Sequence, residues 1–367
     1  MAGVLALGVS MPAAPAGASD STTQSEAASQ AGARKVGYFT QWSIYDRDYF
    51  VKNIDTSGSA AELTHINYAF ANLDASGQCF QGNAPGEADA WADYQRRFTA
   101  ARSVDGVADS YDQPMAGNLN QLAELKEKYP HLKVYISIGG WSWSDDFHAA
   151  AATAQSRTAH VKSCIDMWLR GDLPRIGGAP QGGEGVAAGI FDGVDIDWEW
   201  PGSEGGPGNV VDPADKQNCT ALLREWRTRL DALEAEAGEP YDLTAFLPAD
   251  PAKIEAGYEV EKVFDQLTFA TIQGYDLHGA YEPTTNHQSA LRSPAGDPSP
   301  KRFSIDKTVN AHLDAGAPAN EMVLGVPFYG RGWTGVPDEN DGLFQSSTGP
   351  APAPCEAGYP GTRATRR

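Results

Sequence analysis

The sequence is poor in basic residues, has no long apolar run and lacks the common metal-binding motifs. Lysine and arginine number 28 against 48 aspartates and glutamates, a formal net charge of −20. Such a charge repels phosphate backbones and anionic lipids, so we expect no nucleic-acid partner and no membrane partner. No run reaches about 20 apolar residues, the length needed to cross a bilayer. The seven histidines show no HExxH pattern and no clustering, so we predict no metal site and no other cofactor.

Cysteine is also scarce, with four residues and no CxxC pair: Cys79, Cys164, Cys219 and Cys355. An even number of cysteines in a secreted chain permits disulfides. Cys164 and Cys219 lie in helical patterns that flank one predicted strand, so we favour a disulfide between these two. Free buried thiols are the alternative.

The first 33 residues have the composition of a leader and a linker. Ala2–Val9 is apolar, and Ala16-Gly17-Ala18 has the small-x-small form of a signal-peptidase site. No basic residue precedes Arg34, so we predict that residues 1–18 are a clipped signal peptide of a secreted, extracellular protein; an alanine-rich leader is the alternative. Residues 19–33 read as a flexible linker.

Seven short apolar runs recur along the chain, with helical or irregular stretches between them. Each is rich in β-branched or aromatic residues, as a buried strand is. They are residues 36–42, 65–72, 132–141, 191–200, 243–247, 267–275 and 323–329. The pattern predicts an α/β fold, a (β/α)8 TIM barrel, spanning residues 34–333. A doubly wound sheet is disfavoured because no glycine-rich turn follows the first run.

Two segments interrupt this alternation. Residues 78–117 contain the aromatic residues Trp91, Tyr94, Phe98 and Tyr111. Loops that follow barrel strands lie on the catalytic face, so we expect this segment to wall a cleft. After Trp333 the sequence turns to serine, threonine, glycine, proline and alanine, and no apolar eighth strand follows.

The segment Asp192-Gly-Val-Asp195-Ile-Asp197-Trp-Glu199 carries the most informative pattern. Side chains alternate along a strand, so Asp195, Asp197 and Glu199 share one face, opposite bulky apolar residues. Asp192 has the other parity, so we expect a structural role for it. Burying three carboxyl groups together raises at least one pKa, which a general acid requires. A divalent-cation site and a solvated acidic edge are the alternatives; the run lacks the turn chemistry of a calcium loop.

This segment resembles the DxxDxDxE signature of family-18 chitinases, on the fourth strand. Three more motifs occur in family order. Ser137-Ile-Gly139-Gly140 is similar to the SxGG motif, Tyr275-Asp276 to the YD motif, and residues 326–331 to the segment that ends the seventh strand. The resemblance covers roughly residues 35–333 and implies hydrolysis of β-1,4-linked N-acetylglucosamine polymers, with endo action expected.

The resemblance also implies a role for each matching residue. Glu199 would protonate the glycosidic oxygen, and the 2-acetamido carbonyl of the substrate would attack the anomeric carbon to give an oxazolinium ion. Asp197 would orient the acetamido group, Asp195 would share its proton, and Tyr275 would bond the acetamido carbonyl. The expected sugar-binding residues are Tyr38, Phe70, Trp141, Gln273, Asp276, Tyr329 and Arg331.

The chain departs from the family pattern in two places. Gln273 stands where family members commonly have methionine. Residues 334–367 match only the start of the family's small α+β insertion and end in an irregular tail, so we expect a truncated insertion and a barrel without its eighth strand. A non-hydrolytic oligosaccharide-binding protein and an endoglycosidase acting on N-glycans are the alternative functions. We expect the chain to act as a monomer on chitin or chitooligosaccharides.

Overall fold

Seven parallel strands form the central sheet of the computed structural model, which describes residues 33–352. They are β1 (Val36–Thr40), β2 (His65–Leu73), β4 (Lys133–Gly139), β5 (Gly193–Asp197), β6 (Asp242–Leu247), β7 (Phe269–Ile272) and β8 (Met322–Leu324). Each strand pairs in parallel with the next along the chain, except that the two-residue β3 (Cys79–Phe80) pairs antiparallel with the end of β2. The predicted signal peptide, most of the predicted linker and Cys355 lie outside the described residues.

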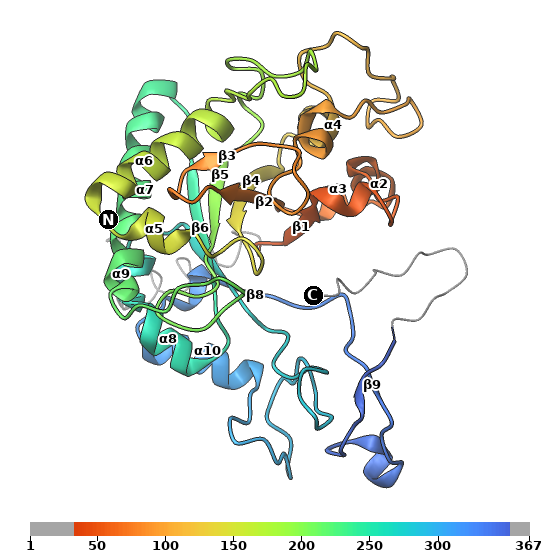
Figure 1. The fold of residues 1–367 in the computed structure, drawn as a ribbon, viewed down its shortest axis with the longest axis vertical. Coiled ribbons are helices and arrows are strands. Elements are labelled where there is room, and N and C mark those ends of the chain that lie inside the picture. The colour runs from red at the N-terminus through yellow and green to blue at the C-terminus, as the bar shows by residue number, and fades with distance from the viewer. Residues whose placement is uncertain (1–32, 353–367) are drawn as a thin grey trace, which may run out of the picture. The chain divides into compact units, whose positions relative to one another are not determined.

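The helices that connect the strands cover the outer side of this curved sheet (Figure 1). The longest is α7 (Asp215–Ala237), which buries Leu222, Leu223, Trp226, Leu230 and Leu233 on one face. The others are α2 (Val51–Thr56), α3 (Ser59–Glu62), α4 (Gly117–Lys128), α5 (Phe147–Ala151), α6 (Ala154–Cys164), α8 (Pro251–Gly257), α9 (Val260–Phe264) and α10 (Ile305–Asp314). Single turns are η1 (Gln41–Ile44), η2 (Trp91–Gln95), η3 (Ile165–Leu169), η4 (Ala319–Glu321) and η5 (Glu339–Gly342). Among the described residues, every helix is too short or too polar to span a bilayer.

All seven predicted strands are confirmed, and the sheet is an incomplete (β/α)8 barrel. The last strand is shorter than expected, since β8 ends at Leu324 whereas the apolar run continues to residue 329. Within residues 33–352, no strand pairs with the free edges of β1 and β8. Beyond β8, Val326 and Phe328 are therefore exposed, Phe328 completely.

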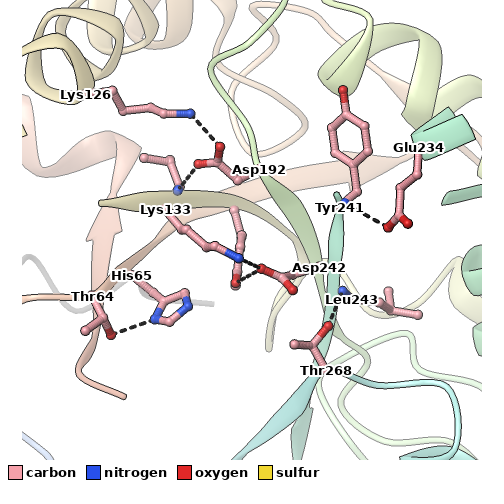
Figure 2. A network of polar contacts seen from close by, with 12 residues as sticks. Thr64, His65, Lys126, Lys133, Asp192, Glu234, Tyr241, Asp242, Leu243 and Thr268 are labelled. Atoms are coloured by element: carbon pink, nitrogen blue, oxygen red, sulfur yellow. Dashed lines mark hydrogen bonds and ion pairs between the residues drawn. The ribbon is translucent and has the colours of Figure 1, made fainter. Parts of the chain in front are cut away.

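A network of polar contacts ties together the amino-terminal ends of the middle strands (Figure 2). Asp192 accepts a hydrogen bond from the Val134 backbone N–H (2.8 Å) and pairs with Lys126 (2.8 Å). Asp242, the first residue of β6, pairs with Lys133 and accepts a bond from the Tyr135 hydroxyl (2.7 Å). Polar groups at this end of a barrel contribute to stability, because the active sites of barrel enzymes lie at the other end.

The predicted cysteine pairing is wrong. Cys164 forms a disulfide with Cys79, not with Cys219, and Cys219 is a buried free thiol on α7. The bond joins β3, at the start of the segment after β2, to the last residue of α6. The helical patterns gave no information about this partner, because β3 is a short strand inside an irregular segment.

The two segments that interrupt the alternation contain little regular structure. In residues 78–117, Tyr94 and Phe98 are buried in the core, whereas Trp91 and Tyr111 are exposed. After β8, strand β9 (Trp333–Thr334) pairs antiparallel with β10 (Gly349–Pro350), and η5 lies between them (Figure 1).

Candidate active site

The three carboxyl groups predicted to share a face lie at the carboxyl end of β5, the fourth strand of the barrel. Asp195 and Asp197 are on the strand and are 0% and 4% exposed. Glu199 follows two residues after the strand ends and is partly exposed. Val194, Ile196 and Trp198, which alternate with the acids, are buried in the core. The strand therefore presents a row of acids that runs from the barrel interior toward its mouth.

Asp195 is the deepest of the three and is held by hydroxyl groups from three strands. It accepts hydrogen bonds from Thr244 Oγ1 (2.6 Å), Ser137 Oγ (2.8 Å) and the Tyr38 hydroxyl (3.4 Å). Burial raises the pKa of this carboxyl, and the hydroxyl donors oppose the rise because they stabilise the ionised form. The donors fix the side chain within the barrel.

Asp197 lies between the other two acids and has a pKa well above its ordinary value. Burial is the main cause, and the negative charges of Glu199 and Asp195 add to it. Among the described residues, Asp197 Oδ1 has no hydrogen-bond partner although it is buried. A buried acceptor without a partner costs free energy, and a bound ligand that donates a hydrogen bond would remove that cost.

Burial raises the pKa of Glu199 to about 7, with a lowering contribution from the Lys253 cation and a raising one from the Asp276 carboxylate. A carboxyl group with this pKa is protonated in an appreciable fraction of molecules near neutral pH. General acids work best when their pKa lies near the operating pH. Glu199 therefore has the protonation behaviour of a proton donor.

Tyr275 and its neighbours lie beyond the carboxyl end of β7. The Tyr275 ring stacks on Phe246, with 6.1 Å between centroids, and contacts the edge of Tyr329 at 6.3 Å. Arg331 binds both oxygens of Asp276, at 2.8 and 2.6 Å, and its guanidinium lies over the Tyr329 ring. Burial and the charges of the neighbouring acids raise the pKa of Tyr275, so its hydroxyl remains a hydrogen-bond donor.

The predicted sugar-binding aromatics lie at the same end of the sheet. Tyr38 is on β1, Phe70 is near the end of β2, and Trp141 follows β4 with 52% of its surface exposed. The Phe70 ring lies 6.1 Å from that of Trp42, which the sequence reasoning missed. Gln273, also predicted to bind sugar, has its side-chain oxygen engaged within the protein, because Oε1 accepts a hydrogen bond from the Ala249 backbone N–H at 3.1 Å.

The two glycines of the Ser137-Ile-Gly-Gly segment allow the backbone after β4 to approach the acid row closely. Gly139 has φ +107°, and a Cβ there would lie 2.4 Å from the Asp197 carbonyl oxygen. Gly140 has φ +81°, and its Cβ would lie 2.9 Å from the Phe70 ring. Both conformations favour glycine. The segment thus joins β4, the acid row and the half-buried ring of Phe70.

Asp192, the first acid of the signature, lies apart from the others. It precedes β5 and belongs to the network at the amino-terminal ends of the strands (Figure 2). Its contacts are structural ones between β4, α4 and β5.

Sequence reasoning also missed Thr244, Ser144 and Lys253. Thr244 pairs in register with Asp195, and the signal was a polar residue within the apolar run 243–247. Ser144 and Lys253 lie outside the recognised motifs, and no sequence pattern marks either residue. Within residues 33–352, no group of three histidine, cysteine or acidic side chains is arranged to hold a metal ion.

Buried acids at the carboxyl end of a barrel strand, one of them with a pKa near neutrality, are features of glycoside hydrolases. The sequence comparison agrees with this class. Residues 34–363 match the profile of Glycosyl hydrolases family 18. The chain therefore belongs to family 18 of the glycosyl hydrolases.

The relatives of this chain include several bacterial chitinases. It is 39% identical to Chitinase C of Streptomyces lividans over 334 residues, which are 88% of this chain and 47% of that protein. It is 37% identical to Chitinase A1 of Niallia circulans, over 86% of this chain and 45% of that protein. The chain thus spans about half the length of these curated relatives. The solved catalytic domain of psychrophilic chitinase B from Arthrobacter TAD20 superimposes with a TM-score of 0.81 at 48% identity, covering 87% of this chain and 75% of that one.

Proposed function

We propose that this chain hydrolyses β-1,4-linked N-acetylglucosamine polymers with retention of anomeric configuration. The observation that carries the proposal is the row of Asp195, Asp197 and Glu199, in which only the outermost acid is partly exposed and has a pKa of about 7. The names of the relatives support chitin as the substrate.

In the proposed reaction, protonated Glu199 donates its proton to the glycosidic oxygen as the bond to the leaving sugar breaks. The carbonyl oxygen of the substrate's own 2-acetamido group forms a bond to the anomeric carbon, which gives a cyclic oxazolinium ion. Ionised Glu199 then removes a proton from water as the water oxygen bonds to the anomeric carbon. The bond between that carbon and the acetamido oxygen breaks, which opens the ring, and Glu199 is again protonated.

The contacts of the other acids support separate roles for them. Within the described part of the chain, one buried oxygen of Asp197 has no partner, and it is suited to accept a hydrogen bond from the acetamido N–H and to stabilise the positive intermediate. Asp195 is held by three hydroxyl groups, so it would accept or release the proton of Asp197 without moving. The Tyr275 hydroxyl would donate to the acetamido carbonyl.

No carboxylate is needed as a nucleophile in this reaction, and the environment of Asp276 agrees with that. Both Asp276 oxygens are engaged by Arg331, which makes this carboxylate a positioning and binding group. The N-acetyl group of the sugar is therefore a chemical requirement of the mechanism, not only a recognition element.

A groove lined with aromatic side chains supports a linear polymer as the substrate. A cavity of about 440 Å³ near Phe70 is lined by Trp42, Tyr45, Trp91, Trp143 and neighbouring residues of the 83–91 segment. Flat aromatic surfaces bind the apolar faces of pyranose rings. Several such surfaces in one cavity would hold further sugars of one chain, which favours chitin over a branched N-glycan.

We also propose that the chain acts outside the cytoplasm. The disulfide between Cys79 and Cys164 supports an oxidising compartment. A carbohydrate-binding protein without activity is the less favoured alternative, because the proton donor Glu199 is present.

The test is a reducing-end assay on soluble chitooligosaccharides with wild-type protein and Glu199→Gln. We expect the wild type to release reducing ends and Glu199→Gln to be at least about 1,000-fold slower while it still binds the oligosaccharide. Glu204→Gln, which removes another acid from a nearby loop, is the control and should remain active. If both the wild type and Glu199→Gln bind but neither cleaves, the chain is a binding protein and the proposal is wrong.

A further inference from the structure

The loop between β4 and α5 contacts the backbone that carries the proton donor. Its central residue is Ser144, which is 1% exposed and lies outside the four motifs of the sequence. Ser144 Oγ accepts a hydrogen bond from the Glu199 backbone N–H at 2.8 Å. It also lies 2.9 Å from the Gly140 carbonyl oxygen and 3.1 Å from the Asp197 carbonyl oxygen.

These contacts use the proton and one of the two lone pairs of the hydroxyl group. A serine hydroxyl has a single proton, which the two carbonyl oxygens share, and one of its lone pairs accepts from the Glu199 N–H. The Gly140 backbone N–H donates to the same Asp197 carbonyl at 2.8 Å. The loop therefore bonds to the backbone on both sides of Trp198. It contacts the Asp197 carbonyl and the Glu199 N–H, which belong to the two peptide groups that orient these acids.

The position of Glu199 explains why such a contact is needed. Strand β5 ends at Asp197, so the ladder of hydrogen bonds that fixes the deeper acids stops before Glu199. Within residues 33–352, Ser144 is the one hydrogen-bond partner of the Glu199 N–H group. A buried N–H without a partner is costly, so the peptide would turn if the hydroxyl were removed.

We propose that Ser144 is a positioning residue for the proton donor, which holds the Glu199 peptide so that its carboxyl group faces the glycosidic oxygen. This inference rests on the proposed function and extends it to a residue outside the acid signature. Ser144 contacts no sugar in this role; it acts through Glu199 alone.

A comparison of two leaving groups separates this role from general support of the fold. A sugar is a poor leaving group and needs protonation, whereas a phenol of low pKa leaves with little help from an acid. We expect Ser144→Ala to lower kcat on chitooligosaccharides about 10- to 100-fold, with KM nearly unchanged, because a small misplacement of a catalytic group is costly. On an aryl chitobioside with such a phenol, the loss in kcat/KM, which reports the steps up to departure of the phenol, should be less than about threefold.

The matched control is Ser142→Ala, which removes an exposed hydroxyl from the same loop and should leave both rates unchanged. Ser144→Cys, which keeps the size and a weak acceptor, should be intermediate, and it serves in place of Ser144→Ala if that variant does not fold. In a Glu199→Gln background, Ser144→Ala should cost nothing further on the aryl substrate.

Three results would overturn the inference: equal losses on the two substrates, a loss expressed in KM, or an additional loss in the Glu199→Gln background. Each would show that Ser144 supports the fold or the sugar and not the acid. A wild-type protein that cleaves neither substrate is a different outcome, because it refutes the proposed function together with this extension.

Discussion

Replacing Lys253 by methionine should move the alkaline limit of activity upward. The Lys253 ammonium lies over the ring of Trp200, 5.4 Å from its centroid, and Trp200 directly follows Glu199 in the chain. The charged groups around it are Glu199, Asp250, Glu204 and Lys301, and among the described residues Lys253 forms no ion pair. Its positive charge favours ionised Glu199 and so opposes the effect of burial, which raises the pKa of the acid to about 7.

The size of the effect follows from the titration of one group. A general acid works in its protonated form, so kcat/KM falls as pH rises through its pKa. The Lys253 charge lowers the pKa of Glu199, whereas the Asp276 charge raises it and remains in the variant, so loss of the Lys253 charge should raise the pKa of Glu199 by about one unit. At pH 8 the protonated fraction would then rise from about 9% to about 50%, so activity relative to the plateau would rise about fivefold.

The assay is a pH profile of kcat/KM on a soluble chitooligosaccharide between about pH 4 and 9. Lys253→Arg keeps the charge and should keep the wild-type limit. Lys262→Met is the control, because it removes the same charge from an exposed side chain that pairs with Glu259. This variant should keep the wild-type limit. An unchanged limit in Lys253→Met, or a shift toward lower pH, would refute the electrostatic reasoning.

Three further changes have defined outcomes. The disulfide closes a loop with a sequence separation of 85, for which the chain-entropy relation gives at most about 4.5 kcal/mol of stabilisation, and typical disulfides contribute about 2–4 kcal/mol. Cys79→Ser should therefore lower the free energy of unfolding, measured in denaturant, by about 2–4 kcal/mol. A loss below about 0.5 kcal/mol would contradict this. Trp42→Ala should lower kcat/KM for a hexamer about tenfold and hardly change that for an aryl chitobioside, and equal losses would place Trp42 outside the polymer groove. Gly139→Ala should push the Asp197 carbonyl away and lower kcat at least about tenfold. Circular dichroism checks that the variant folds. Full activity would show that the close approach of Gly139 to the Asp197 carbonyl is not needed.

The fold could be predicted from the sequence because buried parallel strands have a strong pattern. All seven β-rich runs became strands of the sheet, and the helical pattern at 221–237 lies within α7. The end of the last strand could not be predicted, since an apolar run extends to residue 329 but, among residues 33–352, β8 has a neighbouring strand on one side only. Two-residue strands such as β3 have no periodicity, which is why the disulfide partner of Cys164 was assigned wrongly.

The candidate site was predictable where residues alternate along one strand. Parity alone grouped Asp195, Asp197 and Glu199, and it set Asp192 apart. Contacts between distant segments could not be predicted in this way, because neither a serine in a loop nor a lysine on a short helix belongs to a pattern that points to the acids. Ser144 and Lys253 therefore appear only when the loop after β4 and the helix α8 after β6 are placed beside the acid row.

The most direct test of the central claim is the anomeric configuration of the first product. Proton NMR during cleavage of a soluble chitooligosaccharide, recorded before the anomers equilibrate, distinguishes the two stereochemical outcomes. If Glu199 is the proton donor and the substrate's acetamido group is the nucleophile, the new reducing end must appear first as the β-anomer. A first product with the α-configuration would contradict the account, as would the absence of any product from the wild-type protein.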